Sequence, residues 1–468
     1  MLLSKASIPG FCLLLVLVPV FPWSDGKSHD GVRLMQLLAG LLLLGSLTIA
    51  ALRDRSRIST LPGPAVFGLF LIGTCSVVSA TRPELALREF SLLIMALLAV
   101  WPRESAGRTS FKESQQIAIY LLTGGAALYA ALELLLIVSG LLLNQTLDCW
   151  QVFAGYVNPR FFNHVQTLLI PLLVGVTGLP GLRPLWRHLA WFALSTNTFF
   201  LLLLTGRATL LALMVSSLLA LLIFGAMARR YVIRLLQAFA VGAVLHVLLI
   251  KLLPFMIGME ALPAFRELGE RGSVEARFYL WRLALDMIQA HPLLGVGPMH
   301  YAARLNDEAA HPHNIYLQIA AEYGLPFFFL LIFLGVRWLI RTTQALRKHL
   351  SQSGDPLALA CYAAVIGALV DGGFSGNFVM PLSQLWIVFT LILLGWRLQP
   401  QATSVPVQQP LVHRILCRVV LVMLFIAQLS VVLHSVPEFL QTHVRLTNAI
   451  EQHDADHYSP RFWRDGWF

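Results

Sequence analysis

The sequence predicts an all-α, polytopic membrane protein of about 12 to 13 transmembrane helices, with one large outward loop that contains short helices. Of its 468 residues, 57% are hydrophobic and only 12% are charged, whereas a soluble domain carries about 25% charged residues. Apolar runs of about 17–25 residues recur along the chain, and short basic loops separate them. Because lipid offers the backbone no hydrogen-bond partner, each run is expected to form a helix.

Thirteen apolar segments are candidate helices, with ends placed to within a few residues. They are 8–22, 33–52, 64–80, 84–101, 115–140, 161–179, 186–204, 208–227, 231–257, 321–340, 357–375, 381–398 and 412–434. The first segment follows Lys5 and resembles a signal sequence, but no small-residue cleavage site follows it. We therefore expect it to be retained as a membrane anchor.

The distribution of basic residues predicts the orientation of the chain. With a cytoplasmic N-terminus, one set of alternating loops is basic, as at Arg53, Arg229 and Arg341, and the other set is poor in Lys and Arg except at 258–320. This alternation obeys the positive-inside rule. The long loop and the C-terminal tail are then predicted to face outward, into the periplasm of a Gram-negative cell.

These assignments divide the chain into four sections. They are an N-terminal transmembrane bundle of about nine spans (1–257), a long outward loop (258–320), C-terminal transmembrane helices (321–434) and an outward tail (435–468). The aromatic residues of the tail either anchor it at the membrane interface or stack on sugars, and anchoring is the favoured interpretation.

Composition argues against several functions. The formal net charge of +10 comes from Arg and Lys scattered among loops, which favours topology over nucleic-acid binding. The five cysteines lack metal-ligand spacing, so neither a disulfide framework nor a zinc site is indicated. No phosphate-binding Walker loop is present, so direct ATP-driven work is not expected.

Polar residues from several segments are predicted to meet near the outer surface. Long outward loops tolerate basic residues, but five arginines there favour an anionic ligand, because guanidinium groups match phosphate oxygens. These five are Arg266, Arg271, Arg277, Arg282 and Arg304. At the same predicted depth lie the runs Thr205-Gly206-Arg207 and Asn158-Pro159-Arg160, together with Asn163, His164 and Asp371.

The segment 275–288 is predicted to form an amphipathic helix. Trp281, Ala284, Leu285 and Ile288 recur at helical spacing, with Arg277 one turn before Trp281. Either its arginines contact lipid headgroups, or Arg277 reaches an anionic group in a cavity.

A second short helix is predicted after the run His311-Pro312-His313-Asn314, with Asn314 as its N-cap and Gly324 as its end. Helix N-termini attract phosphate, and a histidine there can act as a general base near neutral pH. The alternatives are a packing role or a metal site with Glu322, which lacks a third ligand at familiar spacing. Glu322 shares a face with Gln318 and is either a second catalytic carboxylate or an orienting partner.

These residues resemble the signature of the O-antigen ligase and Wzy-type polymerase family, which includes pilin-type protein O-oligosaccharyltransferases. The resemblance covers a motif-rich stretch of about 50 residues and one arginine outside that stretch, Arg207. Its pieces are Thr205-Gly206-Arg207, Arg277 with Trp281, His291 to Gly297, and His311 to Gly324.

The resemblance implies a metal-independent GT-C-type glycosyltransferase without a cofactor, in the bacterial inner membrane. Its donor would be an undecaprenyl-diphosphate-linked glycan and its acceptor lipid A-core, a pilin-like protein or another lipid-linked glycan. Arg207 and Arg277 match the donor-diphosphate arginines and His313 the catalytic histidine, although His311 is a second candidate. Glu322 is a further catalytic candidate. The candidates for substrate binding are Arg160, His311, Asn314, Gln318, Trp281, Arg282 and Tyr316.

Two other functions remain open. A transporter of lipid-linked glycans would use the same basic groove, but it is expected to place charges near mid-membrane, where this sequence has few. A structural scaffold would not explain the outward arginines.

Overall fold

The computed structural model describes residues 7–20, 28–52, 64–100, 108–143, 145, 152–156, 158–258, 274–398, 411–441 and 461–463. These residues form helices, turns and connecting loops and no β-strand, which confirms the all-α prediction. Within them, six helices are long and apolar enough to cross a membrane: His29–Ile49, Glu113–Leu142, Arg207–Phe224, Ala226–Met256, Leu325–Ser353 and Arg414–Leu440. Pro9–Val20, Pro64–Ser79, Pro356–Asp371 and Pro381–Arg397 are apolar but shorter. The chain is a multi-pass membrane protein.

Each of the thirteen predicted segments has a helix at its position. The helices are α2 (Ser7–Leu17), α3 (Ser28–Leu52), α4 (Pro64–Ser79), α5 (Pro83–Val100), α6 (Arg108–Leu142), α8 (Pro159–Thr177), α9 (Pro184–Leu203), α10 (Arg207–Phe224), α11 (Ala226–Val247), α12 (Leu253–Met256), α14 (Val274–Ala290), α15 (Ile315–Tyr323), α16 (Leu325–Ser353), α17 (Pro356–Asp371), α18 (Pro381–Arg397) and α19 (Leu411–Leu440). Four short 3-10 or π segments join them: η1 (Val18–Val20), η2 (Ala154–Tyr156), η3 (Leu248–Leu252) and η4 (His300–Ala303).

The prediction of Gly324 as a helix end is confirmed, whereas the prediction of one continuous helix across it is wrong. The segment 321–340 was expected to form a single helix, but Gly324 separates α15 from α16. Its φ of 82° favours glycine, and a Cβ there would lie 2.3 Å from the carbonyl oxygen of Leu293. The chain therefore turns at Gly324, and α16 starts at Leu325.

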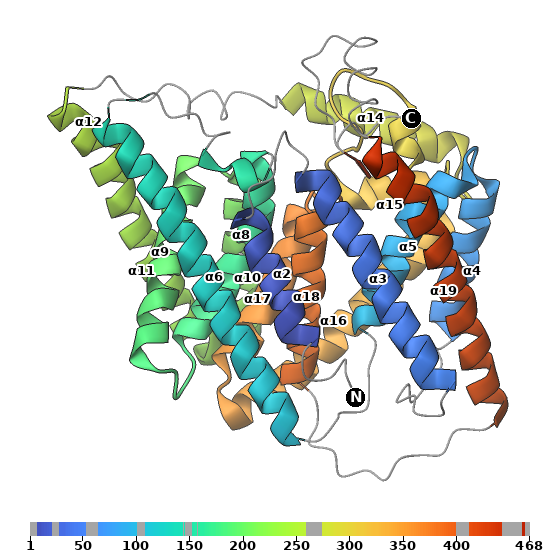
Figure 1. Cartoon of the computed structure of the whole chain (residues 1–468), viewed down its shortest axis with the longest axis horizontal. Coiled ribbons are helices and arrows are strands. Elements are labelled where there is room, and N and C mark those ends of the chain that lie inside the picture. Colours follow the sequence, from blue (N-terminus) through green and yellow to red (C-terminus); the bar gives the residue numbers. More distant parts are fainter. Residues whose placement is uncertain are drawn as a thin grey trace.

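The helices form a bundle that α14 crosses at one end (Figure 1). In the bundle, α17 packs against α8 and α10, while α3 lies beside α19. α14 packs on α15, and α15 also contacts α4 and α16. We refer to the end of the bundle beneath α14 as the α14 side.

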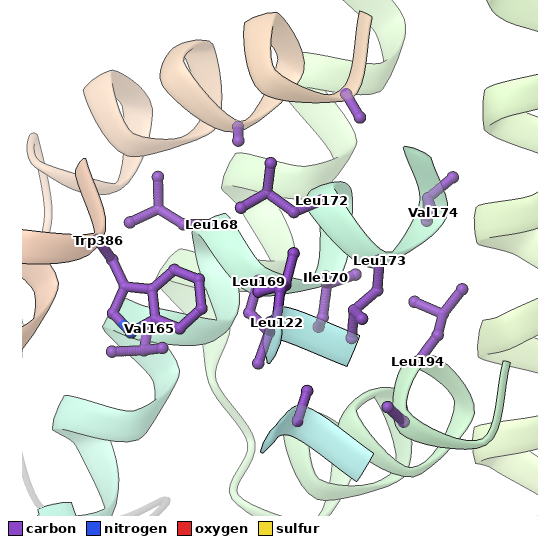
Figure 2. Packing of buried hydrophobic residues seen from close by; sticks show 14 of the residues in the cluster. Leu122, Val165, Leu168, Leu169, Ile170, Leu172, Leu173, Val174, Leu194 and Trp386 are labelled. Carbon is purple, nitrogen blue, oxygen red and sulfur yellow. The ribbon is translucent and has the colours of Figure 1, made fainter. Parts of the chain in front are cut away.

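The largest core surrounds α8. Leucines on successive turns of α8 meet Leu122 of α6, Leu194 of α9 and Trp386 of α18 (Figure 2). Almost every residue of α8 is buried, which is typical of a helix enclosed by other helices. Close packing of this kind holds helices together in lipid, where no hydrophobic effect drives them together. The enclosed helix gives a rigid base to the polar residues at its N-terminus.

The described part of the C-terminal tail corrects the predicted interfacial anchor. Phe462 and Trp463 are 0% and 6% exposed, and Arg461 is 0% exposed. They pack with residues of α3, α5 and α19. The aromatic residues of this short segment therefore fill a protein interior, because buried side chains of three different helices meet them. Trp467 and the other tail residues around them lie outside the described residues.

Candidate functional site

The N-terminus of α8 carries the first candidate arginine. Asn158 caps the helix by accepting the backbone N–H of Arg160 at 2.9 Å, and Pro159 occupies its first turn. The capped turn directs Arg160 toward the α14 side, where its side chain is partly buried. The positive charges of Arg277 and Arg207 act on it there.

The hairpin between α9 and α10 supplies Arg207, which is the first residue of α10 and is exposed. Thr205 has a φ of 50°, so the chain turns sharply before the helix. A Cβ on Gly206 would lie 2.2 Å from Nδ2 of Asn163. The motif Thr205-Gly206-Arg207 thus lets the hairpin approach α8 closely and brings Arg207 near the N-terminus of that helix.

α14 presents Arg277 and Trp281 on partly buried positions. The indole Nε1 of Trp281 donates a hydrogen bond of 3.1 Å to the carbonyl oxygen of Pro312. This bond joins α14 to the histidine segment. Since Trp281 lies one turn after Arg277, the same bond also holds the turn of α14 that carries Arg277 next to the histidine segment.

The predicted apolar face of α14 was partly wrong. Leu285 is 48% exposed, whereas Leu280, Leu283, Ala284 and Met287 are buried. These four residues follow an i, i+3, i+4, i+7 pattern, and Leu285 projects about 100° away from Ala284. Arg282 is exposed on the same helix.

The histidine segment folds back on itself before α15. The backbone N–H of His313 donates to Nδ1 of His311 at 3.3 Å, and the two rings meet edge-on at 4.2 Å between centroids. His313 has a φ of 51°, an uncommon conformation for histidine. His311 is buried and His313 is partly exposed. As predicted, Asn314 caps α15, accepting the N–H groups of Tyr316 and Leu317.

The start of α15 is fastened to the end of α17. The backbone N–H of Ile315 donates to the carbonyl oxygen of Gly372 at 2.8 Å, and the Tyr316 hydroxyl donates to that of Leu369 at 2.8 Å. The fully buried Asp371 lies at this junction.

Asp371 also faces α8. Its Oδ2 accepts a hydrogen bond from Thr167 at 3.3 Å and lies 3.8 Å from Nδ1 of His164. The sequence analysis predicted His164 and Asp371 near the outer surface but did not include them among the site residues, and the structure brings the two side chains together. The sequence signal for this pair is a polar residue near the start of one apolar helix, α8, and another at the end of a second apolar helix, α17.

Electrostatics show that these segments converge. The pKa of His313 falls to about 4, because the ring is desolvated and the positive charges of Arg277 and Arg160 oppose its protonation. Desolvation and the charge of Arg207 also lower the pKa of Arg277. Arg160 of α8 and Arg277 of α14 therefore act on a histidine that is neutral at pH 7, and Arg207 of α10 acts on both of these arginines. Such an arrangement favours an anionic ligand.

Glu322 does not join this arrangement. Its two carboxylate oxygens accept Nη2 of Arg461 at 2.8 and 2.7 Å, and Oε1 also accepts the backbone N–H of Tyr301. Seven residues of helix separate Glu322 from Ile315, a rise of about 10 Å. Of the two roles considered, orienting partner fits these contacts and catalytic carboxylate does not. Gln318 is buried on the same helix.

The remaining predicted arginines are dispersed. Arg304 is exposed, and Arg266 and Arg271 lie outside the described residues. Among the described residues, no group of three or more His, Cys, Asp or Glu side chains is arranged to hold a metal ion.

A comparison with known families agrees with this site. Residues 190–332 match the family model described as O-antigen ligase (Wzy_C). The matched range contains Arg207, Arg277, His311 and His313, whereas Arg160 precedes it. No curated protein matches the chain. Residues 190–332 are therefore similar to the O-antigen ligase family.

Proposed function

Since residues 190–332 are similar to the O-antigen ligase family, we propose that the chain transfers a preassembled oligosaccharide from undecaprenyl diphosphate to an acceptor hydroxyl. Lipid A-core and a pilin-like protein are the acceptors that we consider. The single observation that carries this proposal is the convergence of Arg160 and Arg277 on a neutral His313, with Arg207 close enough to act on both arginines. The family match supports the same class of membrane enzyme, one that moves a lipid-linked glycan.

The arginines would bind the diphosphate of the donor. Arg160, Arg207 and Arg277 repel one another in the free protein, so an anion between them relieves that repulsion. During transfer the bond between the anomeric carbon and the phosphate oxygen breaks, and its electron pair stays on the diphosphate. Guanidinium groups already in place stabilise the negative charge that develops there.

His313 would act as the general base. The acceptor hydroxyl oxygen forms the new bond to the anomeric carbon, and its proton passes to the imidazole. A pKa of about 4 means that the ring is already neutral at pH 7, and the charge of the bound diphosphate raises its basicity for the transfer. His311 would support His313, because it holds the backbone of that residue rather than facing the arginines.

Other predicted binding residues would shape the site. Trp281 holds the histidine segment to α14, and Tyr316 fixes α15 to α17. Asn314 caps the N-terminus of α15. Gln318 and Arg282 flank these positions along α15 and α14. We place the site on the periplasmic face of the inner membrane, where α14 would help to exclude water from the sugar.

Replacing His313 with Ala tests the proposal. We expect loss of glycan transfer from a purified lipid-linked donor, with unchanged protein level and unchanged donor. His188→Ala is the matched control, because His188 is exposed on α9 and outside the site. Full transfer activity in the His313→Ala protein would remove this residue from the mechanism.

A Wzy-type polymerase would use the same donor chemistry and differs only in its acceptor, another lipid-linked glycan. Deletion of the gene separates the two. Loss of capped lipopolysaccharide or of glycosylated pilin identifies a ligase or an oligosaccharyltransferase, whereas loss of long-chain polymer with single-unit capping retained identifies a polymerase. Accumulation of donor on the inner leaflet would instead indicate a transporter.

A further inference from the structure

Three residues near the C-terminus connect distant parts of the bundle. Arg461, Phe462 and Trp463, here called the C-terminal staple, are buried among α3, α5, α15 and α19. None of the functions considered above uses them, although they include a fully buried arginine. Burying an arginine is costly unless it is paired, so a buried arginine with several partners calls for an explanation.

Arg461 pairs with α15. Its Nη2 lies 2.8 and 2.7 Å from the two carboxylate oxygens of Glu322, and 3.7 Å from Oε1 of Glu89 on α5. Glu322 is 0% exposed, so both members of this ion pair are enclosed. Removing either one would leave the other charge buried without its main partner, which destabilises the region strongly.

The backbone of the staple is held from the other side by α3. Arg33 donates from Nε to the carbonyl oxygen of Phe462 at 3.1 Å and from Nη2 to that of Arg461 at 3.2 Å. The same Nη2 donates to the carbonyl oxygen of Val379, just before α18, at 2.8 Å. The staple is thus tied to helices on both sides of it.

Aromatic contacts and a second ion pair complete the attachment. Trp463 donates from Nε1 to Glu438 of α19 at 3.0 Å, and Glu438 is paired with Arg88 of α5. The guanidinium groups of Arg33 and Arg88 lie 5.2 and 5.7 Å from the centre of the Phe462 ring. The staple therefore joins α15 to the α3, α5 and α19 helices.

Glu322 links this attachment to the candidate site. α15 is only nine residues long, with Glu322 next to its last residue and His313 two residues before its start. Glu322 also holds the loop that follows α14, since its backbone oxygen accepts the N–H of Gly297 at 2.9 Å. A short helix held at one end transmits that constraint to the other end, because its backbone hydrogen bonds make it rigid.

We propose that the C-terminal staple positions α15, and with it His313, for glycan transfer. Arg461 is then a positioning residue: it acts through Glu322 and touches neither donor nor acceptor. The catalytic consequence rests on the function proposed above, whereas the effect on α15 does not. One guanidinium nitrogen, Nη2, reaches both oxygens of Glu322, so a lysine at this position keeps the charge of the pair but presents it on a differently shaped side chain.

The test compares full-length Arg461→Ala, Arg461→Lys and Glu322→Gln proteins with the wild type and with Arg341→Ala. Arg341 is exposed on α16 and serves as the control for loss of an arginine. Hydrogen exchange followed by mass spectrometry measures the peptides that cover 274–323. We expect exchange there to become about tenfold faster in Arg461→Ala and Glu322→Gln, with α8 and α10 unchanged.

Transfer kinetics supply the second readout. In Arg461→Ala we expect kcat to fall about tenfold while KM for the donor changes little, because Arg461 pairs with Glu322 and is proposed to act through α15 rather than on the diphosphate. Arg461→Lys should recover part of kcat, since it keeps the charge. A general loss of folding would instead lower the amount of active protein and alter exchange in every helix.

Each result has a separate meaning. Unchanged exchange across 274–323 in Arg461→Ala would overturn the proposal. It would also be overturned if His313→Ala abolishes transfer but Arg461→Ala, despite faster exchange, keeps the full kcat. If the wild type itself transfers no glycan, the proposed function fails, and exchange alone then decides whether the staple holds α15. If Arg461→Ala does not fold, Glu322→Gln and Arg461→Lys are judged by the same two measurements.

Discussion

His313 is expected to stay neutral at pH values where an ordinary histidine is protonated. Burial and the charges of Arg277 and Arg160 bring its pKa from 6.5 to about 4. At pH 5 a group with a pKa of about 4 is about nine-tenths neutral, whereas one with a pKa of about 6.5 is about 3% neutral. The proposed general base is therefore about thirty times more available at pH 5 than an unperturbed histidine.

Replacing Arg277 with Gln removes one of the two positive charges that act on His313. Desolvation is the larger cause and remains, so the pKa of His313 should rise only part of the way toward 6.5. A group with a depressed pKa loses its neutral form as the pH falls through that pKa. The acid side of the activity profile should therefore move to higher pH in Arg277→Gln, in addition to a lower maximum.

The assay is kcat/KM for transfer from a lipid-linked donor to its acceptor between pH 4 and pH 8, a range around the pKa values of about 4 and 6.5. This ratio reports groups of the free enzyme, whereas kcat reports the donor complex, in which the diphosphate raises the pKa of His313. Arg341→Gln is the control for loss of an exposed arginine. A wild-type profile that already falls near pH 6.5 and does not move in Arg277→Gln would refute the buried, cation-flanked base.

Three further substitutions examine the support around the site. His311→Ala removes the acceptor for the His313 N–H, so transfer should slow about tenfold while the acid side of its pH profile stays in place. Complete loss of transfer at every pH would instead identify His311 as the base. Gly206→Ala places a Cβ 2.2 Å from Nδ2 of Asn163 and 2.6 Å from Cδ1 of Leu201, and it should displace Arg207, which raises KM for the donor. Adding Asn163→Ala removes the closer of these two contacts and should lower KM again, and an unchanged KM in Gly206→Ala itself would contradict the steric argument. Asn314→Ala removes the cap of α15 and should destabilise its first turn by about 1 kcal/mol, measured by hydrogen exchange; Asn314→Asp should behave like the wild type, and equal exchange in all three proteins would exclude the cap as a stabilising element.

Local signals in the sequence were sufficient for the helices and for several of their ends. Apolar runs predicted thirteen helices because lipid requires each span to satisfy its own backbone. Asn314 was predicted as an N-cap and Gly324 as a helix end, and the structure has both. Each of these signals acts over a few residues, so no knowledge of the remaining chain is needed to read it.

The candidate site was only partly readable in this way. Arg207, Arg277 and His313 were selected from motifs, and their predicted depth placed them near the same surface. Their mutual approach depends on how α8, α10, α14 and α15 pack, which no local pattern specifies. Asp371 and His164 lie next to each other only because α17 packs against α8.

The sequence by itself determined the membrane class, the helices and the kind of side chain available at the α14 side. Only the tertiary structure decided that Glu322 is an ion-pair partner and that residues 461–463 are buried among the helices. The reason is physical: Arg461 and Glu322 are 139 positions apart, and a lone buried charge becomes stable only when a distant partner reaches it. Helix formation depends on neighbours along the chain, whereas the pairing of buried charges depends on neighbours in space.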